Sequence, residues 1–452
     1  MTLSRRSFVR SSVVALTLSG AMGRVLLGAP LARAQSLRKP KPFPGYGELI
    51  ADPKGILDLP KGFSYRVFSR EGDAIARNVL VPASHDGMAA FRAGPLATWL
   101  VRNHEISAED VEEDGIAPVA HVRGATYDPE GSGGTTTLLV GHDRRLLHQR
   151  ISLAGTENNC AGGPTPWQTW LTCEEDDNVL SKPHGYVFEV DPVFGGNPVP
   201  IVGMGRFEHE AVAFDSRGRA YLTEDADSPF GCIYRFIPRN PLCGNGSLHA
   251  GGTLSALAVE GLSTDLSAVQ TPGTVLPVRW IPVPNANPGE DDTPVREQVV
   301  ALGATQIQKA EGIWTDKDGS IWFVSSRGGG PDAEDEEDRS AAAHGGQIFR
   351  YDPKAQTIEL VVVFAPDSPF DGPDNITVSP YGYALACTDG EDDQWLVGIN
   401  EEGTTFPFAF NPGGDDEFAG ATFSPNGDTL FVNLQSSPAL TFAIWGPFGR
   451  RG

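Results

Sequence analysis

Glu210-Ala-Val-Ala-Phe-Asp215-Ser-Arg-Gly218-Arg-Ala-Tyr-Leu-Thr-Glu224 is the stretch of this 452-residue sequence that indicates the fold. Apolar residues alternate on both sides of a turn that holds Asp215 and, three residues later, Gly218, which is typical of two short strands joined as a hairpin. The pattern recurs in five further segments, the last two more loosely: 311–325, 374–388, 419–433, 159–173 and 86–103. Six repeated hairpins at irregular spacing predict an all-β fold, a six-bladed β-propeller. The long segments 238–298 and 332–338 are interpreted as excursions from the blades, so one domain is expected over 35–452.

The composition narrows the classes of function. The chain has 58 acidic and 35 basic residues and a formal net charge of −23, and a protein that neutralises nucleic-acid phosphates normally carries an excess of Lys and Arg. No nucleic-acid partner is therefore expected. The 53 glycines and 36 prolines favour many tight turns over long helices.

The first 34 residues have the features of an export signal. Arg5 and Arg6 precede a short apolar run, and Ala32-Arg33-Ala34 has the small residues of a cleavage site. Paired arginines predict the twin-arginine route, which exports folded proteins. We therefore expect a periplasmic or secreted protein that partners the twin-arginine machinery during export and has no membrane attachment after cleavage. The alternative is an anchor that is never cleaved.

The repeats also carry acidic residues at one equivalent position. The residue five positions before the turn is an oxygen donor in five of the six copies, and the six residues are Asp86, Asn159, Glu210, Glu311, Asp374 and Ala419. Equivalent positions in a propeller lie at equivalent distances from its axis, so these side chains can converge at one mouth of the central channel. Clustered carboxylates repel one another unless cations or protons offset their charge. The pattern predicts a metal cluster, and the alternative is that each acid faces water.

Cys173 adds a sulfur donor at the end of the second strand of one copy. Four acids follow it directly, in Glu174-Glu175-Asp176-Asp177. A thiolate beside carboxylates favours a transition metal such as iron at the sulfur and calcium or magnesium at the oxygens. The alternative is that Cys173 packs as a small apolar side chain.

Several motifs together resemble a known family. They are Asn159-Cys-Ala-Gly-Gly163, Trp167-Gln-Thr-Trp-Leu-Thr-Cys173-Glu174-Glu175, His209-Glu210-Ala211, Gly372-Pro-Asp374-Asn375 and Gly420-Ala-Thr-Phe-Ser-Pro425, together with the twin-arginine signal. Their order resembles the PhoX family of extracellular alkaline phosphatases over roughly residues 45 to 437. The resemblance implies a six-bladed propeller with iron and calcium ions at its axis.

The resemblance also implies roles for single residues. Cys173 would bind iron, and Glu210, Glu311 and Asp374 would hold the iron and calcium ions, with Glu174 and Glu105 as further ligands. Lys309 stands two residues before Glu311, where the family has a basic residue that grips the substrate phosphate. A lysine there lacks the two-pronged geometry of an arginine. Arg327 is a second candidate for the phosphate, with a surface loop as the alternative, and Asn159 completes the predicted catalytic set.

The function expected from these residues is hydrolysis of phosphate monoesters by an iron- and calcium-assisted in-line attack. The expected cofactors are two ferric ions and two or three calcium ions, the expected partners are small phosphate esters, and a monomer is expected. One alternative is another calcium-dependent propeller hydrolase, such as a lactonase or a phytase, which would not need iron or Cys173. The other alternative is a non-enzymatic binding propeller that uses calcium only for stability.

Overall fold

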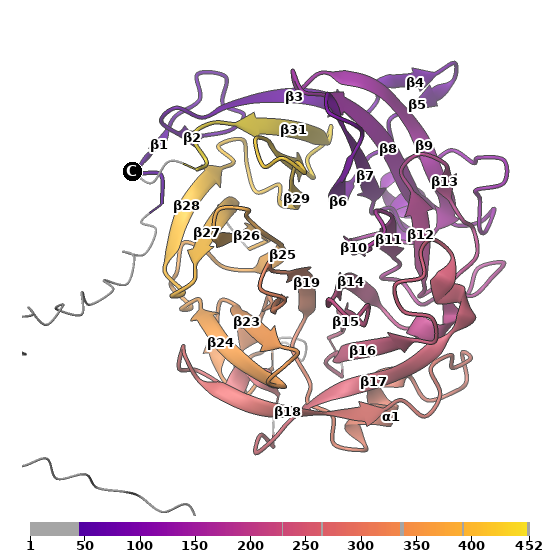
Figure 1. Cartoon of the computed structure of the whole chain (residues 1–452), viewed down its shortest axis with the longest axis vertical. Coiled ribbons are helices and arrows are strands. Elements are labelled where there is room, and N and C mark those ends of the chain that lie inside the picture. Colours follow the sequence, from indigo (N-terminus) through magenta and orange to yellow (C-terminus); the bar gives the residue numbers. More distant parts are fainter. Residues whose placement is uncertain (1–44, 228, 264, 335–338, 391–392, 450–452) are drawn as a thin grey trace, which may run out of the picture. The chain divides into compact units, whose positions relative to one another are not determined.

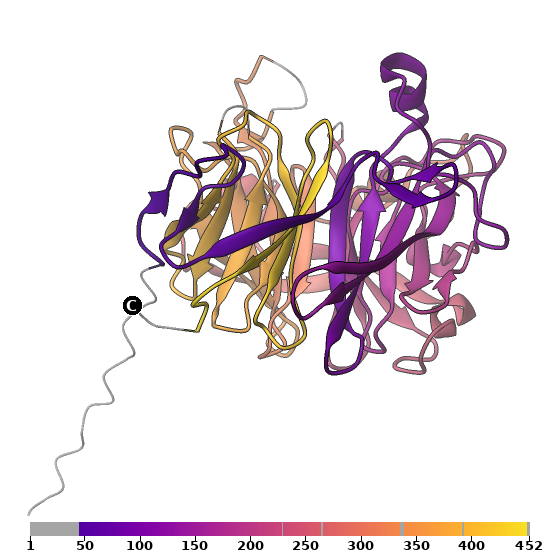
Figure 2. The ribbon, with the colours of Figure 1, turned by 90° about the horizontal axis from the view of Figure 1, so that it is seen from above.

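The computed structural model describes residues 45–227, 229–263, 265–334, 339–390 and 393–449. These belong to one compact unit, Pro42–Gly452, and the predicted export signal over 1–34 lies outside the described residues. Figure 1 shows the unit as a ring of β-sheets that follow one another in sequence order around a central axis, and Figure 2 shows the ring from the side. The prediction of an all-β propeller is confirmed.

Four sheets of the ring have four strands each. One contains β6 (His85–Arg92), β7 (Ala97–His104), β8 (Gly133–Gly141) and β9 (Leu146–Thr156). The next contains β10 (Gly162–Pro164), β11 (Trp170–Cys173), β12 (Val187–Asp191) and β13 (Gly195–Gly196). A third contains β25 (Pro373–Val378), β26 (Tyr383–Thr388), β27 (Trp395–Asn400) and β28 (Thr405–Phe410). The fourth contains β29 (Phe418–Phe423), β30 (Leu430–Leu434), β31 (Leu440–Trp445) and β3 (Ser64–Arg70).

The remaining part of the ring is a nine-stranded sheet that holds two of the repeated hairpins. In sheet order it contains β14 (His209–Phe214), β15 (Ala220–Glu224), β16 (Ile233–Pro238), β17 (Gly252–Val259), β18 (Val275–Pro282), β24 (Thr357–Val363), β23 (Gln347–Asp352), β20 (Ile321–Ser325) and β19 (Ala310–Thr315). Segment 238–298 therefore contributes β17 and β18 to the sheet, so its interpretation as a mere excursion is wrong. Since β18 joins the two hairpin units by hydrogen bonds, the number of blades stays a prediction.

Short elements decorate the ring. Two-stranded sheets are formed by β1 (Leu49–Ile50) with β2 (Leu59–Pro60), β4 (Ala74–Ala76) with β5 (Val79–Leu80), and β21 (Gly328–Gly329) with β22 (Ala343–His344). The helices are η1 (Asp110–Asp114), η2 (Val202–Met204), η3 (Ser247–Ala250), η4 (Leu266–Ala268) and α1 (Val295–Val300). Among the described residues, no helix is long and apolar enough to cross a membrane.

The core lies between neighbouring sheets. One buried cluster joins Met88 and Leu100 of the first sheet to Phe431 and Ala443 of the last, and similar clusters fill the other interfaces. Strands buried on both faces need nearly continuous apolar runs, as in β30, where every residue is buried. The ring closes because β3, from the start of the unit, pairs with β31, from its end.

Five of the six inner hairpins contain a β-bulge near the start of the inner strand. The bulges follow His85, His209, Ala310, Pro373 and Ala419, and each leaves two residues of the inner strand facing one residue of its partner. The second residue of the bulge is small in most copies, because inner strands meet closely at the axis. A Cβ atom on Gly87 would lie 2.5 Å from the Cα of Ala161, and one on Gly312 would lie 2.7 Å from the backbone nitrogen of Ile376.

This close contact predicts that adding a single methyl group at Gly87 lowers the free energy of unfolding. Gly87→Ala would push the backbone of β6 away from Ala161, and overpacking of this kind destabilises a protein by about 1–3 kcal/mol. Urea unfolding of the two proteins measures the loss. Gly289→Ala is the matched control, since its Cβ would meet only the Asp292 carboxylate, at 3.5 Å. Equal losses for the two variants would contradict close packing at the axis.

Candidate metal centre and substrate pocket

The bulges place four acids around the axis. Asp86, Glu210, Glu311 and Asp374 are each the first residue of a bulge, so the same local distortion presents each carboxylate at the same depth. Gly420 holds the corresponding place in β29, one residue after the predicted Ala419, because that bulge lies one position later. All four carboxylates are nearly inaccessible to solvent. The predicted convergence of these acids is thus seen in the structure.

The sheet of β10–β13 contributes a thiol at this level. The residue two positions before the axial one has a positive φ in four copies, at Ser84 (46°), Asn158 (43°), Lys309 (46°) and Gly372 (49°). By this alignment Cys160, and not Asn159, is the equivalent of Asp86 and Glu311. The predicted alignment of this repeat with the others is therefore off by one residue. Bulges and residues with positive φ change the register of a strand, and the apolar pattern of the sequence does not show them.

Three overlapping groups of possible ligand atoms connect these side chains into one cluster. The groups are Asp86, Glu105 and Cys160; Cys160, Glu175 and Glu210; and Glu210, Glu311 and Asp374. Within each group the ligand atoms lie within 4.8 Å of one another. Cys160 and Glu210 each belong to two groups, so they lie at the centre of a continuous row of donors.

Glu210 is the least compensated acid of the row. Neither of its buried carboxylate oxygens has a hydrogen bond of normal geometry among the described residues, and the Cys160 thiol is a neighbouring weak donor. Burial raises the pKa of Glu210 well above its usual range, and the charge of Asp374 raises it further. By contrast, Glu311 accepts a 2.7 Å hydrogen bond from Ser326, and Asp374 accepts one of 3.1 Å from Asn375.

A second tier of acids stands at the ends of the second strands. Glu105 follows β7, Glu175 comes two residues after β11, and Asp389 follows β26, while Glu417 precedes β29. Gln435 donates to both Glu105 and Glu417, at 2.8 and 2.5 Å. Burial raises the pKa of Glu105, Glu175 and Glu417, and neighbouring carboxylates of the same cluster contribute to the rise for Glu175 and Glu417.

The donor set fits multivalent cations. Carboxylate oxygens suit calcium and one thiolate among them suits a transition metal such as iron. Buried carboxylates without hydrogen bonds, as at Glu210, are costly unless a cation neutralises them. Burial also raises the pKa of the Cys160 thiol, as do Asp86 and Glu210 beside it, and a bound metal would reverse this by favouring the thiolate.

Cys173 does not reach this cluster. Its side chain is fully buried in an apolar cluster with Leu171, Val187 and Met204, and it belongs to none of the three ligand groups of the described residues. Among the described residues the possible ligand groups therefore contain Cys160 and not Cys173, although burial and the charge of Glu210 raise the pKa of the Cys173 thiol. Cys160 could have been found in the sequence, since it stands in the quoted motif Asn159-Cys-Ala-Gly-Gly163.

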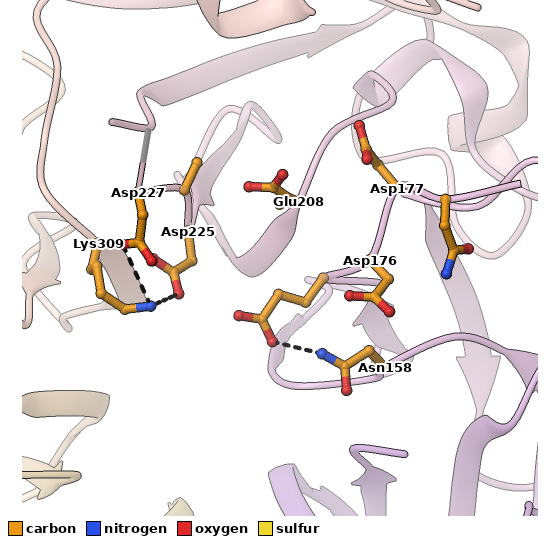
Figure 3. A pocket seen from close by; sticks show the side chains of 10 residues that line it. Asn158, Asp176, Asp177, Glu208, Asp225, Asp227 and Lys309 are labelled. Carbon is orange, nitrogen blue, oxygen red and sulfur yellow. Dashed lines mark hydrogen bonds and ion pairs between the residues drawn. The ribbon is translucent and has the colours of Figure 1, made fainter. Parts of the chain in front are cut away.

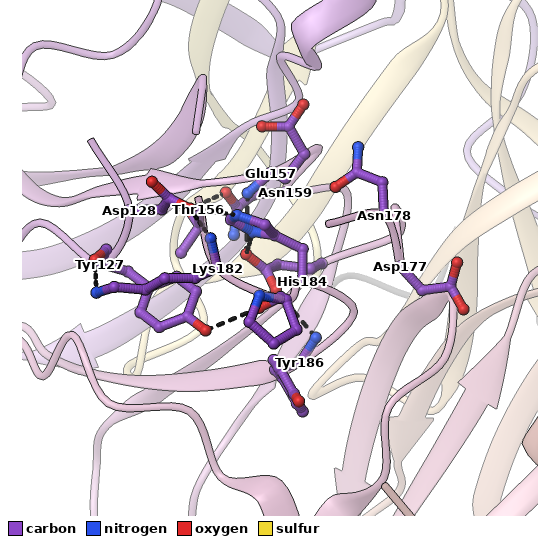
Figure 4. A network of polar contacts seen from close by, with 12 residues as sticks. Tyr127, Asp128, Thr156, Glu157, Asn159, Asp177, Asn178, Lys182, His184 and Tyr186 are labelled. Atoms are coloured by element: carbon purple, nitrogen blue, oxygen red, sulfur yellow. Dashed lines mark hydrogen bonds and ion pairs between the residues drawn. The ribbon is translucent and has the colours of Figure 1, made fainter. Parts of the chain in front are cut away.

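Asn159 and Glu174 make hydrogen bonds that stabilise the chain next to the site. The amide of Asn159 is fully buried, where it accepts a hydrogen bond from Thr156 and donates one of 2.9 Å to Thr172. Asn159 therefore has a structural role, contrary to its predicted place in the catalytic set. Glu174, predicted as a metal ligand, instead accepts hydrogen bonds from His184 at 2.7 Å and from the Tyr186 backbone at 3.0 Å, in the network of Figure 4.

His184 holds this network together. Its second ring nitrogen lies 3.5 Å from the Asp128 carboxylate, which also accepts hydrogen bonds from Ser181 and from the Lys182 backbone. The carboxylates of Glu174 and Asp128 raise the pKa of His184 against the effect of burial. The network ties the 181–184 segment to Glu174, and this fixes the chain next to the candidate ligand Glu175.

A pocket of about 370 Å³ opens beside the cluster. Ten residues line it: Asn158, Glu175, Asp176, Asp177, Asn178, Glu208, Asp225, Ala226, Asp227 and Lys309 (Figure 3). Glu175 belongs to both the pocket and the ligand row, so the pocket adjoins this row of possible ligands. Lys309 donates to Asp225 at 2.6 Å and lies 3.9 Å from Asp227, and these charges hold its pKa above the usual range.

The structure thus brings together most of the predicted residues. Glu105, Glu210, Glu311 and Asp374 share the cluster, and Lys309 stands in the wall of the adjoining pocket. Arg327 is exposed, and it lies near enough to Asp389 for its charge to act on that carboxylate. Sequence reasoning missed Cys160, Asp389 and Glu417, and it noted Glu175 and Asp225 only as acids near the mouth of the channel, without assigning either a role.

Comparisons with known proteins agree with this geometry. The family model described as alkaline phosphatase PhoX matches residues 44–438. The chain belongs to the PhoX family of alkaline phosphatases. It is therefore a phosphatase, and the resemblance seen in its motifs is confirmed.

Two solved structures illustrate what the chain is similar to, and only the first has a TM-score above 0.5. PhoX of Pseudomonas fluorescens, in complex with vanadate, a transition state analogue, is 19% identical, with a TM-score of 0.69 over 90% of this chain and 98% of that chain. A gluconolactonase of Xanthomonas campestris is 12% identical, with a TM-score of 0.43 over 89% of this chain and 98% of that chain. No curated protein matches the sequence.

The buried acids predict a pH dependence of stability in the metal-free protein. Burial and the charge of Asp389 raise the pKa of Asp374 from 3.8 to about 7. Between these values the unfolded chain releases a proton that the folded chain keeps, so stability falls as pH rises from about 4 to 7. Urea unfolding of chelator-treated protein across this range measures the fall.

Asp374→Asn is the control for this measurement. Because each pKa unit corresponds to about 1.4 kcal/mol, the variant should lose at least about that much less stability than the wild type over the same range. Parallel stability curves for the two proteins would show that Asp374 is not held protonated by its neighbours.

Proposed function

We propose that this PhoX phosphatase hydrolyses phosphate monoesters outside the cytoplasm, with iron and calcium held by the axial cluster. The observation that supports this most directly is the row of buried acids around Cys160 and Glu210, in which neither carboxylate oxygen of Glu210 has a hydrogen-bond partner of normal geometry among the described residues. The extracytoplasmic location is supported by the paired arginines and the Ala32-Arg33-Ala34 sequence of the N-terminal segment. Twin-arginine export would carry the folded protein.

The possible ligands form two kinds of site, which differ in their donor atoms. Cys160, with Glu210 and Glu175 close to it, offers the sulfur and oxygen donors that suit a ferric ion. Asp86 with Glu105, and Glu311 with Asp374, offer oxygen donors that suit calcium. When bound, these ions would supply the positive charge that stabilises the phosphoryl group in the transition state. We propose two ferric and two or three calcium ions, in agreement with the family resemblance.

The chain itself would position the substrate. Lys309 presents an ammonium group at the pocket wall, and its contact with Asp225 leaves further N–H bonds for a phosphate oxygen. Its backbone is held in a left-handed conformation with φ of 46°, two residues before Glu311, so cation and ligand are placed by one local structure. Arg327 would add positive charge at the exposed side of the site. The protein would act as a monomer on small phosphate esters.

Metal analysis and turnover test this proposal together. Protein purified after export should contain iron and calcium, and hydrolysis of p-nitrophenyl phosphate should be lost on chelation and regained when both metals are restored. Protein that contains neither metal and stays inactive after both are supplied would contradict the proposal. A lactonase or a phytase-like enzyme would retain its activity without iron.

The two cysteines give a sharper test of the site. Cys160→Ser should lower iron content and turnover, because a serine hydroxyl is a poor substitute for a thiolate ligand. Cys173→Ser should keep the iron and instead lower the free energy of unfolding by about 1–3 kcal/mol, since a hydroxyl would be buried in an apolar cluster. The reverse pattern of iron loss would return the ligand role to Cys173.

A further inference from the structure

The pocket beside the cluster has a charge that is unexpected for an enzyme acting on anions. Six of its ten lining residues are acids, and Lys309 is the single basic residue among them. The ammonium group of Lys309 is already held by Asp225 and Asp227. Unlike the axial row, most of these acids belong to none of the ligand groups found among the described residues. Glu208 forms an ion pair of 3.4 Å with Arg296, while Asp176, Asp177, Asp225 and Asp227 lie outside the ligand groups, so the axial metals would not take up these four carboxylates.

The pocket also has free capacity to accept hydrogen bonds. Asp225 is only 6% exposed, and its Oδ1 atom is buried without a hydrogen-bond partner. The side chains of Asp176 and Asp177 make no hydrogen bond within the described part of the chain, and Figure 3 shows them on the side of the pocket opposite Lys309. A buried carboxylate oxygen without a donor is costly, so the pocket is suited to a ligand that carries donors.

The lining indicates which kind of cation would fit. Quaternary ammonium groups are usually bound by aromatic rings, and none of the ten lining residues is aromatic. Carboxylates and amides instead match a primary ammonium, which has three N–H donors. The volume of about 370 Å³ is in the range of small-molecule sites.

From these observations we infer that the acidic pocket binds the alcohol part of the substrate, and that the preferred esters are phosphate monoesters of amino alcohols with a protonated primary amine. The phosphate would lie at the axial cluster and the ammonium group between Asp176, Asp177 and Asp225. This inference rests on the proposed phosphatase function and adds the substrate class to it.

A matched pair of esters tests the inference. 2-Aminoethyl phosphate and propyl phosphate have nearly the same size and differ in the positive charge. With the metal-loaded enzyme, kcat/KM should be at least about tenfold higher for 2-aminoethyl phosphate, equivalent to ~1.4 kcal/mol. Choline phosphate, with a quaternary ammonium, should fall between the two. High ionic strength should reduce the preference, since charges in an open pocket are screened.

Variants separate the pocket from the intrinsic reactivity of the esters. In Asp176→Asn/Asp177→Asn the preference should fall about tenfold, through a higher KM for 2-aminoethyl phosphate, because a contact made equally in ground and transition states acts on KM. Propyl phosphate, which has no ammonium group, should not show this rise in KM. Asp177→Asn alone should give a smaller fall, and Glu402→Gln, which removes an exposed charge outside the pocket lining, should give none.

The outcomes distinguish two failures. If both esters are hydrolysed with the same preference in wild type and double variant, the inference is wrong and the phosphatase function stands. The same holds if salt leaves the wild-type preference unchanged, or if choline phosphate is the best substrate. If the metal-loaded wild type hydrolyses neither ester, the proposed function fails, and the inference fails with it.

Discussion

Mutual repulsion among buried carboxylates is the constraint on which the rest of this structure depends. Asp86, Glu210, Glu311 and Asp374 are brought to the axis by one repeated distortion, a β-bulge near the start of an inner strand. Burial makes their ionised forms costly, and each carboxylate makes ionisation of the next more costly still. A propeller can hold such a row because apolar clusters between the sheets stabilise the fold.

The two tiers of the site follow from the direction of the strands. The inner strand supplies the axial donors at its bulge, and the following strand ends close by with a second acid such as Glu105 or Asp389. Segments outside the sheets then fix the positions of these acids through hydrogen bonds. Gln435 donates to Glu105 and Glu417, and His184 contacts Glu174, the neighbour of Glu175. Rigid strands thus position the ligands, while loops build the pocket and set its charge.

Sequence reasoning succeeded where the repeat stayed in register. Glu210, Glu311 and Asp374 share a spacing of eight residues to the glycine of the following turn, and all three were correctly assigned to the axial cluster. It failed by one residue at Ala419, where the bulge lies one position later, and at Asn159, where the position of the left-handed residue Asn158 makes Cys160 the equivalent residue. It failed for Cys173 because alternation along a strand decides which face a side chain occupies, and the tertiary structure alone shows that the face of Cys173 is apolar.

The sequence by itself determined the repeated hairpin, the all-β class, the family and the gathering of acids at one phase, because these depend on local patterns and spacing. Only the tertiary structure decided that Cys160, and not Cys173, lies among the possible ligands, that β18 joins two repeats into one sheet, and that acids from three loops surround the pocket beside Lys309. The physical reason is that ligand geometry and pocket charge arise between segments distant in the chain. Packing around the ring brings these segments together, and no periodic pattern in the sequence indicates which of them will meet.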